Sequence, residues 1–175
     1  CMAQQATPGP MDVPAVPRGL LRHRVSASDA ALYRPAAASS EKSPERAAAF
    51  AVDGSDDSRW TSIYADDQWL SVDLGEVLAL ARVEVRWEKA YAKTYLLQGS
   101  IDGQSWATFR SEVGHEGWVV SSLPPKSQAR WVRLYGQTRA TQFGFSVFDL
   151  KVYALEAVLG GDPSAAVPAV TRLSA

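Results

Sequence analysis

Acidic and hydroxyl residues gather in one short stretch of this 175-residue chain, Asp53–Ser62. The stretch reads Asp-Gly-Ser-Asp-Asp-Ser-Arg-Trp-Thr-Ser, and it combines three carboxylates with hydroxyl side chains and a turn glycine. Hard cations such as Ca²⁺ take roughly six to eight oxygen ligands from groups of these kinds. The stretch therefore has the chemistry of a calcium-binding loop, and the alternative is a solvated acidic turn between two strands.

The spacing within this stretch excludes an EF-hand. Such a loop needs a glycine at its sixth position and a bidentate glutamate at its twelfth. Counted from Asp53, these positions hold Ser58 and Tyr64. On spacing alone, the acidic turn is favoured over an ion site.

The overall charge and composition narrow the range of functions. The formal net charge is −1, so no global field attracts nucleic acid or anionic lipid. The chain carries no nucleophile elbow, phosphate-binding glycine loop, metal-binding histidine motif or cysteine nucleophile in a catalytic context. We therefore expect a protein that is not an enzyme, has no catalytic residues and binds no nucleic acid.

The single cysteine is Cys1, so the sequence allows no intramolecular disulfide. A mature bacterial lipoprotein begins with a lipidated cysteine followed by a tether. Met2–Pro17 is rich in Gln, Ala and Pro, as a tether would be. Cys1 is therefore a candidate lipidation site and the only expected route to a membrane, with a secreted or cell-envelope location. The alternative is a fragment that happens to begin at cysteine.

Hydrophobic residues alternate with polar ones along much of the chain, which is the period of a strand. In Ala81–Glu88, apolar and charged residues alternate strictly, as in a strand with one buried face. Asp102-Gly103 is typical of a hairpin turn, and Glu45–Ala51 is the only helical segment expected inside this region. The expected strands are Gln68–Leu74, Ala81–Glu88, Thr94–Ile101, Trp118–Leu123, Arg130–Tyr135 and Gly144–Tyr153.

Short strands separated by turn signals predict an all-β fold, an antiparallel β-sandwich or barrel. We expect an N-terminal tether or linker over residues 1–34, the sandwich over 35–154 and a flexible tail over 155–175. Within the linker, residues 19–34 form either a short helix or a segment packed on a sheet edge.

A set of ordered motifs makes the chain resemble a discoidin domain, also called the F5/8 type C domain. The resemblance is nearest to the bacterial family 32 carbohydrate-binding modules, and it implies a jelly-roll-like β-sandwich. The motifs are Ala47–Gly54, Arg59–Ser62, Gln68–Gly75, Trp87–Tyr95, Ser100–Gly103 with Trp106, Arg130–Gly136 and Phe145–Tyr153.

This resemblance implies a structural Ca²⁺ in the loop before the Arg-Trp pair. Family members usually carry Glu where this chain has Asp149, and often Thr where it has Ser58. Such an ion would link the first loop to the last strand and stabilise the fold without taking part in chemistry. The implied ligands are the Asp53 carboxylate, the Ser58 hydroxyl and carbonyl, Asp149, and carbonyls near Ala48 and near Ser55 or Asp56.

Loops at one end of a sandwich are its usual recognition surface. Aromatic rings cover the apolar faces of sugars, and planar polar groups bond their hydroxyls. The family resemblance implies a site for β-glucans or chitosan, and Glu88 together with Asp66 or Asp67 would suit an amino sugar. The expected carbohydrate-binding residues are Tyr64, Asp67, Glu88, Tyr91, Lys93, Arg139, Gln142 and Phe143.

These residues also have structural interpretations. Glu88 and Lys93 would form a surface ion pair, and Tyr91 and Phe143 would cap the end of the sandwich. Trp87 follows the inward positions Val83 and Val85, so it is expected in the core.

The combined prediction is a monomeric, non-catalytic carbohydrate-binding module that recognises an extracellular or cell-wall polysaccharide. The main alternative is an envelope lipoprotein that serves as a scaffold for a protein partner. Lipid binding, as in the discoidin domains of clotting factors, is a further alternative.

Overall fold

A computed structural model describes residues 21–159. Cys1, the expected tether up to residue 20 and the tail from residue 160 lie outside the described residues. The chain divides into a compact unit, His23–Glu156, and a second unit made of the terminal segments. The elements are β1 (Leu21–Asp29), β2 (Ala36–Ala38), η2 (Pro44–Arg46), η3 (Ala48–Ala51), β3 (Trp60–Thr61), β4 (Gln68–Trp87), β5 (Ala92–Ser100), β6 (Ala107–Val113), β7 (Gly117–Ser122), β8 (Gln128–Arg139) and β9 (Ser146–Leu159).

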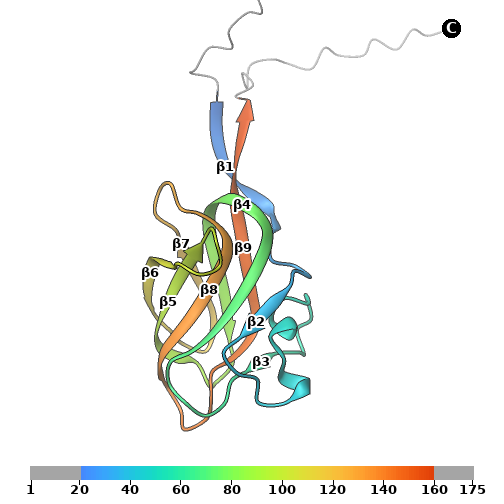
Figure 1. The fold of residues 1–175 in the computed structure, drawn as a ribbon, viewed down its shortest axis with the longest axis vertical. Helices are drawn as coiled ribbons and strands as arrows, with labels where there is room; N and C mark the ends of the chain where they lie inside the picture. Colours follow the sequence, from blue (N-terminus) through green and yellow to red (C-terminus); the bar gives the residue numbers. More distant parts are fainter. Residues whose placement is uncertain (1–20, 160–175) are drawn as a thin grey trace, which may run out of the picture. The chain divides into compact units, whose positions relative to one another are not determined.

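The strands form two layers joined by the long strand β4, as Figure 1 shows. The first half of β4 pairs with β2 and β8, and β5 and β6 continue that layer. The second half of β4 pairs with β7 and β9, and β9 also pairs with β1 and β3. The pairings among β2 to β9 are antiparallel, so the predicted antiparallel β-sandwich is confirmed.

Strand β4 merges two strands that the sequence predicts as separate, Gln68–Leu74 and Ala81–Glu88. Its register against β8 shifts between Asp73 and Leu78, where the strand passes from one layer to the other. Gly75 lies there with a φ of +87°, which side chains rarely adopt. The Asp73 carboxylate accepts the backbone N–H of Gly75 at 2.8 Å, so the bulge is stabilised locally.

Two other predicted segments differ from the structure. Glu45–Ala51 is not a helix of about two turns, because extended backbone at Ala47 divides it into the short 3₁₀ turns η2 and η3. Neither turn has a side-chain cap. Of the segment 19–34, Leu21–Asp29 is a strand paired with β9, so the sheet-edge alternative is correct and the helix is not. That strand comes from the predicted linker.

The core lies between the layers, as the alternation predicts. Leu70, Val72 and Leu74 are buried, and so are Val83 and Val85 on the second half of β4. The largest fully buried side chains in the described part of the chain are those of Trp60, Trp87, Tyr95 and Phe145. Trp87 is therefore a core residue, as its place in the alternation predicts.

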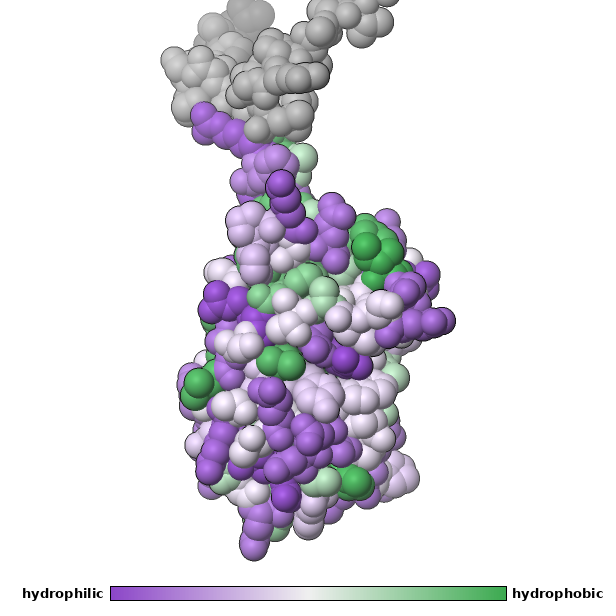
Figure 2. Space-filling model, turned by 60° about the vertical axis from the view of Figure 1, so that its left-hand side comes forward, coloured by the Kyte–Doolittle hydropathy of each residue, from purple (hydrophilic) through white to green (hydrophobic). Residues whose placement is uncertain are grey.

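The surface outside the core is mixed in character. On the face shown in Figure 2, hydrophobic residues are scattered among hydrophilic ones. Within residues 21–159 no helix is long and apolar enough to cross a membrane.

Candidate functional site

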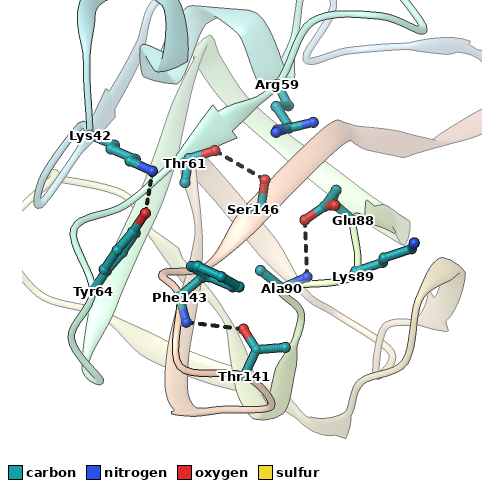
Figure 3. A pocket seen from close by; sticks show the side chains of 10 residues that line it. All are labelled: Lys42, Arg59, Thr61, Tyr64, Glu88, Lys89, Ala90, Thr141, Phe143 and Ser146. Atoms are coloured by element: carbon teal, nitrogen blue, oxygen red, sulfur yellow. Dashed lines mark hydrogen bonds between the residues drawn. The ribbon is translucent and has the colours of Figure 1, made fainter.

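A cavity of about 470 Å³ opens among the loops that follow β3, β4 and β8 (Figure 3). The loop after β2 contributes Lys42 to its wall. The side chains therefore come from four segments that are far apart in the sequence. The lining residues are Lys42, Arg59, Thr61, Tyr64, Glu88, Lys89, Ala90, Thr141, Phe143 and Ser146.

Ser146, the first residue of β9, joins the loops beneath this cavity. Its backbone oxygen accepts the N–H of Glu88 at 3.0 Å, and its own N–H donates to the oxygen of Ala90 at 2.9 Å. Its hydroxyl lies 3.0 Å from that of Thr61, which is its register partner on β3. The pairing of β3 with β9 therefore sets the distance between the loops after β3 and β4.

Two aromatic rings form one wall of the cavity. Tyr64 and Phe143 meet edge to face, with ring centroids 5.6 Å apart and an interplanar angle of 77°. Each residue is 48% exposed, so both rings have surface free for a ligand. The ammonium group of Lys42 lies 4.6 Å from the Tyr64 ring centroid and donates a hydrogen bond to its hydroxyl. Such rings suit the apolar face of a sugar.

Glu88 supplies the only carboxylate among the residues that line this cavity. One of its oxygens accepts the backbone N–H of Ala90 at 3.0 Å, which holds the side chain against its own turn. Lys42, Arg59 and Lys89 line the same cavity. The expected Glu88–Lys93 ion pair is not present among the pairs of residues 21–159.

The structure brings three of the eight expected carbohydrate-binding residues together, namely Tyr64, Glu88 and Phe143. Asp67 instead accepts a hydrogen bond from the hydroxyl of Tyr135 at 3.4 Å. Tyr91 packs against the core, and Lys93 is exposed. The five that do not line the cavity are Asp67, Tyr91, Lys93, Arg139 and Gln142.

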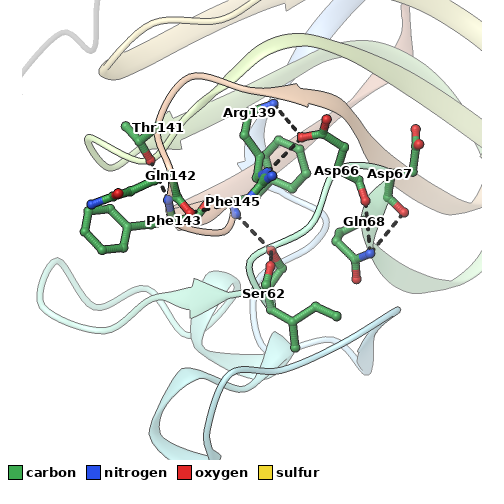
Figure 4. Close-up of polar contacts among 10 residues, drawn as sticks. Ser62, Asp66, Asp67, Gln68, Arg139, Thr141, Gln142, Phe143 and Phe145 are labelled. Atoms are coloured by element: carbon green, nitrogen blue, oxygen red, sulfur yellow. Dashed lines mark hydrogen bonds and ion pairs between the residues drawn. The ribbon is translucent and has the colours of Figure 1, made fainter.

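Arg139 links the loop that carries Asp66 to the loop that carries Gln142 and Phe143 (Figure 4). Its Nε donates to the Asp66 carboxylate at 2.8 Å, and its Nη1 donates to the backbone oxygens of Gln142 and Phe143 at 3.3 and 3.4 Å. These bonds to Arg139 lower the pKa of Asp66. The Asp66 carboxylate therefore stays ionised, and the guanidinium of Arg139 balances its charge. Asp66 does not add to the negative charge of Glu88.

Three charged residues of the lining were not predicted from the sequence as binding residues, namely Lys42, Arg59 and Lys89. Lys42 is brought to the cavity because its backbone N–H donates to the oxygen of Thr61 at 2.8 Å. Arg59 belongs to the Arg-Trp motif, and Lys89 directly follows Glu88. Arg59 and Lys89 therefore lie in motifs that the sequence shows, whereas Lys42 lies in none, and the direction of the three side chains could not be predicted.

Gly144 is needed where the Phe143 loop passes the loop after β3. A Cβ at this position would lie 2.4 Å from the backbone oxygen of Ser62 and 2.6 Å from that of Ile63. We expect Gly144→Ala to lower the free energy of unfolding by roughly 1–3 kcal/mol, because neither oxygen can move freely. Chemical denaturation measures this. Gln142→Ala, at an exposed position in the same loop, is the control and should leave the stability unchanged.

The acidic loop at Asp53 lies apart from the cavity and is internally bonded. One Asp53 oxygen accepts the N–H of Ser55 at 3.0 Å, and the other accepts the Ser58 hydroxyl at 2.5 Å. One carboxylate oxygen of Asp56 pairs with the Nη1 of Arg86 at 2.9 Å.

Asp149 supplies the buried carboxylate next to this loop. Its pKa is raised to about 6, chiefly by burial and also by the charges of Asp29, Asp53 and Asp56, against the opposing effect of Lys151. Within residues 21–159 no three acidic, histidine or cysteine side chains are grouped as metal ligands. A cation here would therefore depend on Asp53 and Asp149 together with hydroxyl and backbone oxygens. That donor set has the oxygen chemistry that Ca²⁺ prefers.

Solved structures similar to this chain include two sugar-binding modules of one bacterial enzyme. Chitosan-binding module 1 of a chitosanase/glucanase from Paenibacillus sp. IK-5 is 34% identical, with a TM-score of 0.70 over 73% of this chain and 99% of that one. Module 2 of the same enzyme, solved with chitotriose, is 35% identical, with a TM-score of 0.69 over 72% of this chain and 100% of that one.

A much longer curated protein is also similar. It is the polysaccharide lyase 8 family protein HylA of Enterococcus faecalis, which is 36% identical over 120 residues. The match covers 64% of this chain and 9% of HylA, so the chain spans less than a tenth of that relative's length.

The family comparison agrees with the sandwich and with the ordered motifs. The F5/8 type C domain matches residues 35–148, which include β2 to β8 and the loops around the cavity. The chain therefore belongs to the F5/8 type C domain family.

Proposed function

We propose that this domain is a non-catalytic module that binds a polysaccharide of the β-glucan or amino-sugar type in the Tyr64–Phe143 cavity. The observation that carries the proposal is the convergence of Tyr64, Phe143 and Glu88 from three separate loops. The rings offer faces for the apolar side of a sugar, and the carboxylate of Glu88 accepts hydrogen bonds from hydroxyl or ammonium groups.

The similar modules support the amino-sugar part of the proposal. Two chitosan-binding modules are 34–35% identical to this chain and are covered almost completely by it. Glu88 alone would neutralise the ammonium group, because Asp66 is paired with Arg139 and Asp67 lies outside the cavity. A module of this kind would hold an extracellular or cell-wall polysaccharide, and we propose that it acts outside the cell.

Calorimetric titration with chitotriose and with a neutral β-glucan oligosaccharide tests the proposal. Tyr64→Ala and Glu88→Gln should each weaken binding at least about tenfold, which corresponds to about 1.4 kcal/mol. Trp118→Ala is the control, since Trp118 is also partly exposed but does not line the cavity. If neither ligand binds, or if both cavity variants bind like the unmodified chain, the proposed site is wrong.

We also propose that the acidic loop holds a structural Ca²⁺. Asp53, Ser58 and Asp149 would bind it together with the carbonyls of Ala48 and Asp56. Bound there, the ion would supply positive charge to a cluster of carboxylates and cross-link η3 and its following loop to β9. The support is the burial of Asp149 among carboxylates, with Lys151 as its one ion-pair partner within residues 21–159, at 3.7 Å.

A further inference from the structure

The Tyr64–Phe143 cavity continues into a second one. This neighbouring cavity has a volume of about 390 Å³ and is lined by residues of η2 and the segment before it. Lys42, Arg59 and Thr61 line both cavities, so the two form one groove that runs from Phe143 to Arg46. The second cavity is lined by Lys42, Ser43, Glu45, Arg46, Arg59 and Thr61.

The second cavity is rich in cations that have no carboxylate partner. Lys42, Arg46 and Arg59 take part in none of the ion pairs formed within residues 21–159. They outnumber the one acid in its lining, Glu45, which is exposed. Elsewhere in the sandwich, arginines such as Arg86, Arg130 and Arg139 are each paired with an aspartate. The groove therefore carries more positive than negative side chains.

The hydrogen-bond donors of these cations are also incompletely used. The Nε of Arg59 is buried and has no hydrogen-bond partner. Arg46 donates to the backbone oxygen of Glu45 at 3.0 Å. An unpaired buried donor destabilises the protein, and an anionic acceptor on a bound ligand would supply these cations with hydrogen-bond partners. Guanidinium groups match carboxylates and sulfates particularly well because they can donate two parallel bonds.

We infer that the groove selects a polysaccharide that carries an anionic group, a carboxylate or a sulfate, on the sugar next to the one held against Tyr64 and Phe143. The anionic group would lie between Lys42, Arg46 and Arg59. The inference rests on the proposed function, since the Tyr64–Phe143 cavity holds the first sugar. It makes an acidic heteropolysaccharide a better ligand than an uncharged glucan.

Calorimetric titration of the full chain with matched tetrasaccharides tests this selection. One ligand alternates glucuronate with N-acetylglucosamine, and the second is the same oligosaccharide with its carboxyl groups reduced to alcohols. We expect the acidic ligand to bind at least about tenfold more tightly at low salt, with the difference shrinking as salt screens the charges. A sulfated form of the reduced oligosaccharide shows whether sulfate replaces carboxylate, and tight binding of either anion supports the inference.

Arg46→Gln identifies the groove as the source of the preference. This variant should reduce the ratio of acidic to neutral affinity several-fold. Lys126→Gln removes the same charge from an exposed turn outside both cavities and should leave the ratio unchanged. Equal binding of the acidic and reduced ligands overturns the inference but leaves the proposed glycan site standing. Failure of every oligosaccharide, chitotriose included, overturns both.

Discussion

Trp87→Ala is expected to lower the free energy of unfolding by about 3–5 kcal/mol, the usual cost of removing a large buried aromatic side chain. Trp87 is 1% exposed at the end of β4. Its ring lies edge to face with Tyr95, at a centroid distance of 5.2 Å, and its centroid lies 6.4 Å from that of the Phe145 ring. Chemical denaturation measures the loss.

The same substitution should also weaken glycan binding, because Glu88 directly follows Trp87 and is positioned by the end of the strand. Trp118→Ala is the matched control. Trp118 lies opposite Arg86 on the neighbouring strand β7 and is 40% exposed, so its loss should cost much less. Similar unfolding midpoints for the two variants would contradict the assignment of Trp87 to the core.

Asp149→Asn is expected to stabilise the chain when calcium is absent. The pKa of Asp149 is raised from 3.8 to about 6 in the folded state, chiefly by burial. Between these values the folded chain keeps a proton that the unfolded chain releases, so stability falls as pH rises from about 4 to about 6. The full cost is on the order of 3 kcal/mol above that window. Asparagine carries no charge there and avoids this cost.

Calcium should reverse the order of stability of the unmodified chain and the Asp149→Asn variant. A bound cation stabilises the ionised Asp149, so the unmodified chain should gain stability at pH 7.5 on addition of calcium, and Asp149→Asn should not. Thermal unfolding with calcium and with a chelator measures both effects. Asp57→Asn, in the exposed part of the same loop, is the control and should retain the response.

The two parts of this prediction fail separately. If the melting temperature of the unmodified chain is the same in calcium and in chelator, the proposed calcium site is wrong. An Asp149→Asn variant that is less stable than the unmodified chain in chelator would contradict the buried-charge explanation.

Local pattern was enough to predict most of the sandwich. Alternation in Ala81–Glu88 identifies the buried face of β4, because side chains of a strand point to opposite sides in turn. Alternation does not reveal that Gln68–Trp87 is one strand, since the bulge near Gly75 interrupts the period. The expected helix over Glu45–Ala51 is wrong because about two turns are too short for helical propensity to outweigh the extended backbone at Ala47.

For the candidate site, too, local sequence pattern predicted one part and tertiary contacts decided the rest. The sequence by itself determined the β-sandwich and the family resemblance, because these depend on local alternation and ordered motifs. It also gave Tyr64, Glu88 and Phe143 as candidate sugar-binding residues, because they lie in loops expected at one end of the sandwich. Only the tertiary structure joined Lys42 and Arg59 to them and paired Arg139 with Asp66 outside the cavity lining. Contacts of this kind depend on the register of β3 with β9 and on loop hydrogen bonds between distant segments. No local pattern encodes such a register, so the charge of the groove became visible only in the folded chain.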